Sequence, residues 1–260
     1  AREQSEKLSP WWAALFWAAL GLGILLKGPV MVLVTGGTIL GLIAMERRMK
    51  WLGLLQPLWG VPLMLLVAAP WYIAIGLATD GAFFRTALGY SVAGKIAGTH
   101  QNHGGPFGYH ALLFTGMFWP GSLFGLLAIP FAWIERRVPA VRFAIAWIIP
   151  AWLVFELSGT KLPHYTLPLL PAVAMLSAAA IQKAGDAKWF GRPRLFAVTA
   201  FFWLVFTLVL TIGVPALRLE LQQDAAFGPL LLGGLALLGC AIVLALVAQG
   251  RPRAGVAAMM

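Results

Sequence analysis

The groups best suited to chemistry lie in one polar segment, SGTKLPHYTLP (158–168), between two apolar runs. Pro163 and Pro168 prevent a regular helix here, and irregular backbone at membrane depth is tolerated where it is buried in protein or lines a wet cavity. The charge of Lys161 and the hydroxyl of Tyr165 could together hold a phosphate. On spacing alone a simpler interpretation is preferred, in which Lys161 extends its ammonium to the membrane interface and Tyr165 belongs to the aromatic belt.

Two other segments carry groups of the same kind. In LLKGPV, Lys27 precedes a Gly-Pro break, and the interface is again the simpler explanation, with direct ligand contact as the alternative. In GTHQNHGGPFGYH, His100 and His103 have no third ligand at zinc-like spacing, so the pattern does not favour a metal site. No P-loop, dinucleotide fingerprint, HExxH or nucleophile-elbow motif is present.

The elements that must position these groups are transmembrane helices. The 260-residue chain is 60% hydrophobic and 11% charged, with a mean hydropathy of +0.84, which excludes an ordinary soluble enzyme. Its apolar runs predict an all-α, polytopic membrane helix bundle of about eight transmembrane helices, with an external re-entrant or irregular loop region at 76–108. The candidate helices are 11–26, 30–45, 51–75, 109–134, 141–155, 167–181, 195–214 and 228–248.

The distribution of charge predicts the orientation. Net charge is +10, and eight spans place 14 of the 19 basic residues in odd-numbered connections on one side. The positive-inside rule assigns that side and both termini to the cytoplasm, so the charge indicates topology and not a nucleic-acid partner. The external side receives all four histidines and the remaining cations, which are Lys27, Arg85, Lys95, Lys161 and Arg218. Each could belong to a solvated loop, but together they favour an anion site.

Two features of the chain bear on its extent. The one cysteine, Cys240, lies in an apolar run, so no disulfide can form within the chain. The first residue is Ala1, and no signal-peptide pattern precedes the first apolar run. We therefore interpret residues 1–260 as a single transmembrane domain from a longer protein.

Three blocks carry a resemblance to a known family. They are GLGILLKGPV, then APWY with HGGPFGYHALLF and FWPGSL, and then ELSGTKLPHYTLPLLPAVAML. Together they resemble the membrane GT-C glycosyltransferases of the protein O-mannosyltransferase and lipid A aminoarabinose transferase type. The resemblance implies an inner-membrane enzyme that takes a sugar from a polyprenyl-phosphate carrier. The acceptor would be a glycan, lipid or protein on the external, periplasmic face, and the question of a divalent metal cofactor stays open.

The resemblance also implies roles for individual residues. Lys161 and Tyr165 match the positions that lie near the carrier phosphate, which favours the phosphate over the interface for Lys161. Lys95 is the best positional match for a basic residue of the preceding external loop. Further candidates for substrate contact are the other basic and imidazole groups on the external side: His103, His164, Lys27 and Arg85.

Two departures from the family pattern limit this assignment. Ser91-Val92 stand where the aminoarabinose branch has a Glu-His pair, so the sugar and the metal stay open. The family's acidic catalytic motif belongs to a first external loop, and neither Asp80 nor Glu156 sits in such a motif. We therefore expect a carrier-binding, C-terminal membrane portion that lacks the catalytic Asp. The alternative is a secondary transporter or lipid flippase, because broken helices and intramembrane lysines also mark transport paths.

Overall fold

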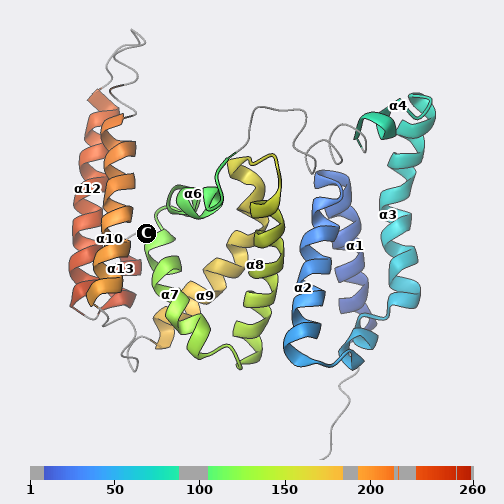
Figure 1. The fold of residues 1–260 in the computed structure, drawn as a ribbon, viewed down its shortest axis with the longest axis horizontal. Coiled ribbons are helices and arrows are strands. Elements are labelled where there is room, and N and C mark those ends of the chain that lie inside the picture. The colour runs from blue at the N-terminus through green and yellow to red at the C-terminus, as the bar shows by residue number, and fades with distance from the viewer. Residues whose placement is uncertain are drawn as a thin grey trace, which may run out of the picture. The chain divides into compact units, whose positions relative to one another are not determined.

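The computed structural model describes residues 9–87, 105–183, 193–213, 216, 227–249 and 251–258. Within these ranges the regular structure is helical and contains no strand, which confirms the all-α prediction. The chain divides into two compact units (Figure 1). Unit 1 comprises Ala1–Phe107 and Ala146–Leu162, and unit 2 comprises Gly108–Ile145 and Pro163–Met260.

Unit 1 is built around a helical hairpin. Its helices are α1 (Pro10–Lys27), α2 (Val30–Glu46) and α3 (Pro57–Ala78), with a 3-10 turn η1 (Lys50–Leu55) and a short α4 (Ala82–Phe84). Gly28 ends α1 with a φ of 66°, a conformation that glycine adopts without strain, and its N–H donates to the carbonyl of Ile24 at 2.7 Å. The first two apolar runs are therefore separate helices and not one long one.

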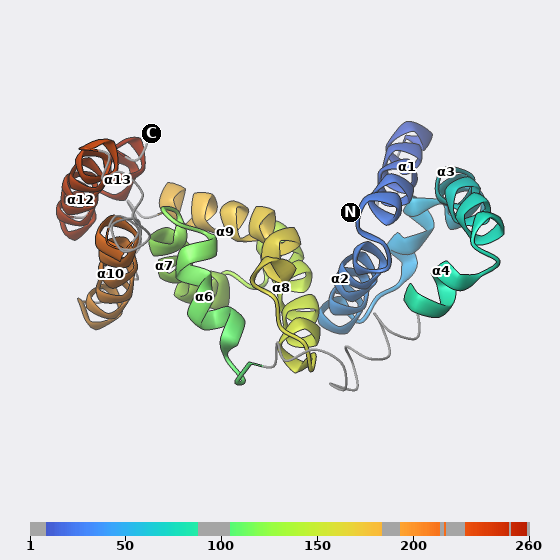
Figure 2. The ribbon, with the colours of Figure 1, turned by 90° about the horizontal axis from the view of Figure 1, so that it is seen from above.

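Helix α1 packs closely along α3 (Figure 2). A Cβ at Gly21 would lie 2.9 Å from both the carbonyl oxygen of Met64 and the Cβ of Val67, so the absence of a side chain permits this approach. The Tyr72 hydroxyl donates to the carbonyl of Ile24 at 3.1 Å. These contacts fix the end of α1 that carries Lys27 against α3.

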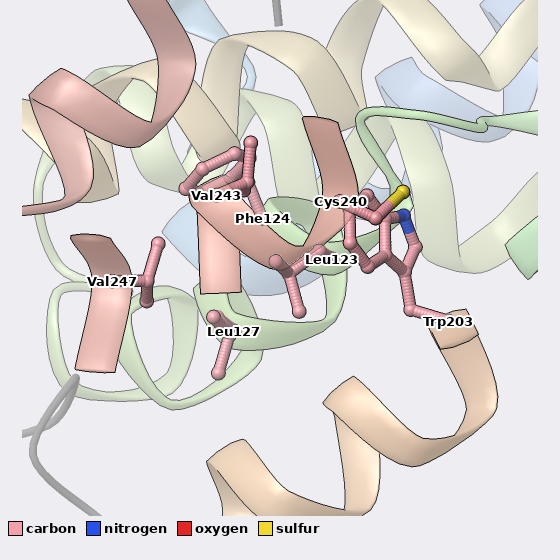
Figure 3. Packing of buried hydrophobic residues seen from close by; sticks show 7 residues of the cluster. All are labelled: Leu123, Phe124, Leu127, Trp203, Cys240, Val243 and Val247. Atoms are coloured by element: carbon pink, nitrogen blue, oxygen red, sulfur yellow. The ribbon is translucent and has the colours of Figure 1, made fainter. Parts of the chain in front are cut away.

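Unit 2 contains the remaining helices. They are α6 (Tyr109–Met117), α7 (Ser122–Ile134), the 3-10 helix η3 (Pro163–Leu169), α9 (Leu170–Lys183), α10 (Pro193–Leu208), the π-helical η4 (Val209–Gly213), α12 (Phe227–Ala248) and α13 (Pro252–Ala257). Helix α8 (Pro139–Leu157) begins in unit 2 and ends in unit 1. The core of unit 2 forms where α7, α10 and α12 meet, around Trp203, Leu123 and Val243 (Figure 3).

The predicted helix over 109–134 is wrong in one respect, because α6 and α7 are separated by a break at 118–121. Pro120 lacks an N–H group and restricts the backbone of Trp119, which interrupts the helix. Two indole hydrogen bonds join this break to helix α10, one donated from each side. Trp203 Nε1 donates to the carbonyl of Pro120, and Trp119 Nε1 donates to Thr207 Oγ1, each at 3.1 Å.

The other candidate helices overlap observed ones, but the bounds of two are wrong. The candidate 51–75 joins η1 to α3 across Gln56, whose φ is 49°, and the candidate 167–181 begins inside η3. Among the described residues, five helices are long and apolar enough to span a membrane: Pro10–Lys27, Pro57–Ala78, Pro139–Leu157, Pro163–Lys183 and Arg194–Gly213. Shorter apolar helices occupy Val30–Glu46, Ser122–Ile134 and Gly233–Ala248. The structure is therefore a polytopic membrane helix bundle, and the number of eight spans stays a prediction.

Candidate functional site

Lys161 lies in the irregular segment 158–162 that follows the end of α8. Its side chain is buried, with 9% relative exposure. The Nζ atom donates to the carbonyl of Gly105 at 3.1 Å and to the carbonyl of Ser158 at 3.3 Å. The polar segment is thus in contact with the end of the predicted external loop, 56 residues earlier in the chain.

The environment of Lys161 disfavours the interface-anchor interpretation. A lysine that extends to the interface keeps its ammonium in water, whereas this ammonium is bonded to two backbone carbonyls. An ammonium has three donors, and a buried charge is costly unless a charged partner is present. Within the described part of the chain, Lys161 has no carboxylate partner. The arrangement is suited to an anionic ligand.

Tyr165 lies in η3, in unit 2, and is half-buried. Its ring stacks against the imidazole of His110, with ring centroids 6.3 Å apart and an interplanar angle of 23°. His164 is exposed and meets the same ring edge-on, at 5.3 Å. Lys161 and Tyr165 are four residues apart in the chain, so the motif reaches both units.

His110 is a residue to which the sequence analysis gave no role. It lies in the first turn of α6 and is 1% exposed, between the rings of Tyr109 and Tyr165. The available signal was an imidazole at the start of an apolar helix, directly after a tyrosine. The stacking indicates that His110 holds the ring of Tyr165 in place.

Replacing His110 by alanine is expected to lower the free energy of unfolding by about 1–3 kcal/mol, because a buried ring contact and its polar partners are lost. His110→Phe should recover part of this loss, since it keeps the stacked ring. Thermal unfolding in detergent measures the effect. His164→Ala is the matched control, because His164 meets the same ring from an exposed position. Equal destabilisation by the two alanine variants would contradict the positioning role.

Two further predicted site residues, Lys27 and Arg85, lie in unit 1. Lys27 is exposed in the last turn of α1, and Arg85 is exposed directly after α4. Among the described residues, no hydrogen bond or ion pair joins either of them to Lys161. Lys95 and His103 lie outside the described residues.

The two carboxylates considered in the sequence analysis, Asp80 and Glu156, differ in their exposure to solvent. Asp80 is exposed after the end of α3, whereas Glu156 is 4% exposed in the last turn of α8. Glu156 was predicted in an external segment, and the helix extends further than expected and includes it. No group of three His, Cys, Asp or Glu side chains that could hold a metal occurs within the residues the structure describes.

Solved structures share this fold. Two solved structures of ArnT from Cupriavidus metallidurans match it, one bound to undecaprenyl phosphate with a TM-score of 0.70 and one in the apo state with a TM-score of 0.68. Each match covers 98% of this chain at 22% identity, and the chain covers 48% and 47% of those proteins. The chain therefore has the helical fold of the matching part of these two ArnT structures.

The chain is also similar in sequence to curated proteins. The chain is 29% identical over 227 residues to the undecaprenyl phosphate-alpha-4-amino-4-deoxy-L-arabinose arabinosyl transferase of Pectobacterium carotovorum subsp. carotovorum, with 86% of this chain and 39% of that protein covered. It is 31% identical over 218 residues to the protein of the same name from Aeromonas hydrophila subsp. hydrophila, with 82% and 38% covered. No family model matches the chain.

These matches confirm the resemblance seen in the three sequence blocks. The chain is related in sequence and in fold to the aminoarabinose transferases among the membrane GT-C enzymes. It spans about two fifths of the length of the curated relatives it matches.

Proposed function

We propose that the chain is the carrier-binding, C-terminal membrane portion of a glycosyltransferase. It binds a polyprenyl-phosphate-linked sugar and serves transfer of that sugar to an acceptor on the periplasmic face of the inner membrane. The acceptor class implied by the resemblance in the sequence blocks is a lipid such as lipid A, with a glycan or a protein as alternatives. The names of the relatives support undecaprenyl phosphate as the carrier and an aminoarabinose as the sugar.

The observation that carries the proposal is the buried ammonium of Lys161. A phosphate would accept a charge-assisted hydrogen bond from it and would provide the opposite charge that the two carbonyls lack. We propose that Tyr165 and Lys95 complete the phosphate contacts. Lys27, Arg85, His103 and His164 are proposed as weaker contacts to the rest of the substrate.

Catalysis needs a group that this chain does not supply in a recognisable motif. Direct displacement at the sugar's anomeric carbon requires a general base near the acceptor hydroxyl. We propose that the base is an aspartate of another part of the protein, because neither exposed Asp80 nor buried Glu156 lies in the family's acidic motif. The residues described here bind and orient the donor.

The experiment that tests the proposal separates transfer from transport. The protein as encoded in full is reconstituted in vesicles with an undecaprenyl-phosphate-linked aminoarabinose and lipid A. The proposal expects sugar on lipid A, and expects movement of unmodified carrier across the bilayer to stay at the protein-free rate. Carrier movement without transfer would support the alternative of a lipid flippase.

The orientation is proposed from charge, with both termini cytoplasmic and eight spans. On a Cys240→Ser background, a single cysteine at position 85 should react with an impermeant maleimide added from outside. A cysteine at position 136 should react only after the membrane is opened. Both positions are exposed, so burial does not confound the comparison. The reverse pattern would overturn the orientation.

A further inference from the structure

The charges of unit 2 are segregated to one end. In the sequence, its described acidic and basic residues all fall where α7, α9 and α12 end and where α8 and α10 begin. These helix ends lie at the same end of the unit (Figure 1). One of these residues, Glu135, is acidic. The cations, which we call the basic end, are Arg136, Arg137, Arg142, Lys183, Arg194, Arg251 and Arg253.

Contacts between helices bring several of these charges together. Lys183 Nζ, at the end of α9, pairs with Glu135 at 3.0 Å, just after α7. Arg253, in α13, donates to the carbonyl of Gln182 at 2.6 Å, in the last turn of α9. The ends of α7, α9 and α13 are therefore adjacent, and their cations form a single surface.

One cation of this surface is held beside an exposed indole. Arg136 donates to the carbonyl of Trp133 at 2.5 Å, and its guanidinium carbon lies 4.7 Å from the centroid of the Trp133 ring. The indole is 70% exposed. An exposed tryptophan at the end of an apolar helix is typical of the boundary between lipid tails and headgroups, so this contact places Arg136 at headgroup depth.

The described negative groups of unit 2 do not balance the charges of Arg136 and Arg253. Glu135 is the single described carboxylate of unit 2, and it is engaged by Lys183. The carbonyls of Trp133 and Gln182 each accept one N–H from an arginine, whereas a guanidinium carries five N–H donors. Most of the donors of Arg136 and Arg253 are therefore available to an external anion.

We propose that the basic end binds the phosphate groups of anionic phospholipids in the leaflet that it faces. Guanidinium groups match phosphate oxygens in geometry and charge, and clustered cations at the end of transmembrane helices attract acidic headgroups. The ligand is a diacyl phospholipid, and the residues differ from those of the carrier site. The inference therefore stands independently of the proposed function.

Native mass spectrometry of the purified protein, titrated with phosphatidylglycerol or phosphatidylcholine, tests this inference. Wild-type protein should retain phosphatidylglycerol in preference to phosphatidylcholine. Each cation near an anionic surface contributes about fivefold in affinity, so the triple variant R136Q/K183Q/R253Q should bind phosphatidylglycerol about a hundredfold more weakly. Binding of phosphatidylcholine should not change.

The matched control removes the same charge from unit 1. R47Q/R48Q/K50Q neutralises three exposed cations that the positive-inside rule assigns to the same side of the membrane. If the basic end is a specific binding site, this control should retain wild-type phosphatidylglycerol binding. Equal losses in the two triple variants, or no loss in either, would overturn the inference in favour of a topological role for these cations.

A second variant guards against misfolding, because R136Q/K183Q/R253Q also removes contacts between helices. Arg137 and Arg251 are exposed, and no side-chain hydrogen bond or ion pair is described for either. R137E/R251E should keep the thermal stability of the wild type and weaken phosphatidylglycerol binding at least tenfold. Unchanged binding in this folded variant would contradict the proposal.

Discussion

Replacing Lys161 by alanine is expected to lower the affinity for undecaprenyl phosphate by about ten- to a hundredfold. The reason is the loss of a charge-assisted contact to phosphate, which contributes about 1.5–3 kcal/mol. The measurement is equilibrium binding of the carrier to the protein as encoded in full, in detergent or in lipid discs. Lys161→Arg should recover part of the affinity, because the charge returns with a different geometry.

A further substitution, Lys161→Met, distinguishes a ligand-binding lysine from one that anchors the segment at the membrane interface. The buried ammonium is bonded only to neutral carbonyls among the described residues, so Lys161→Met should leave the stability of the carrier-free protein unchanged or higher. An anchor would behave in the opposite way, with lower stability and unchanged carrier affinity. Lys50→Met is the matched control, because Lys50 is exposed and lies outside the polar segment.

Replacing Trp203 by alanine should have the largest effect on stability, about 3–5 kcal/mol of the free energy of unfolding. Trp203 is 1% exposed and packs with Leu123 and Cys240 in the core of unit 2 (Figure 3). Its indole also donates to the carbonyl of Pro120, at the break between α6 and α7. The substitution therefore creates a cavity and removes one of the two indole contacts to the break.

Trp203→Phe separates the effect of losing the hydrogen bond to Pro120 from the effect of creating a cavity. It keeps most of the ring volume and leaves the Pro120 carbonyl without the indole donor, so the expected loss is about 1 kcal/mol. Reversible unfolding in mixed micelles measures all variants. Trp11→Ala is the control, because Trp11 is 71% exposed at the start of α1. A loss in Trp203→Ala no larger than in Trp11→Ala would refute the central position of this core.

The sequence predicted the helices well because long apolar runs in a membrane protein have few alternatives to a helix. The break at Gly28-Pro29 and the irregular segment at 158–162 were both visible from glycine and proline. The division of 109–134 into α6 and α7 was missed, although Pro120 was present. Its stability depends on hydrogen bonds with Trp203 and Thr207 of α10, more than 80 residues away in the chain, which local pattern does not reveal.

The candidate site was predicted in part. Lys161 was identified from a polar residue in a proline-broken segment, whereas its burial against Gly105 depends on a contact between distant segments. The stacking of His110 on Tyr165 is likewise a tertiary contact, and a single histidine in an apolar helix carries no local sign of it. Residue type could thus indicate the chemistry, and only packing could show which groups are held in place.

The most direct test of the account is a structure of the protein with undecaprenyl phosphate bound. We expect a phosphate oxygen about 3 Å from Nζ of Lys161, with the ammonium still beside the carbonyls of Gly105 and Ser158. A phosphate bound elsewhere, with Lys161 bonded only to those two carbonyls, would contradict this expectation.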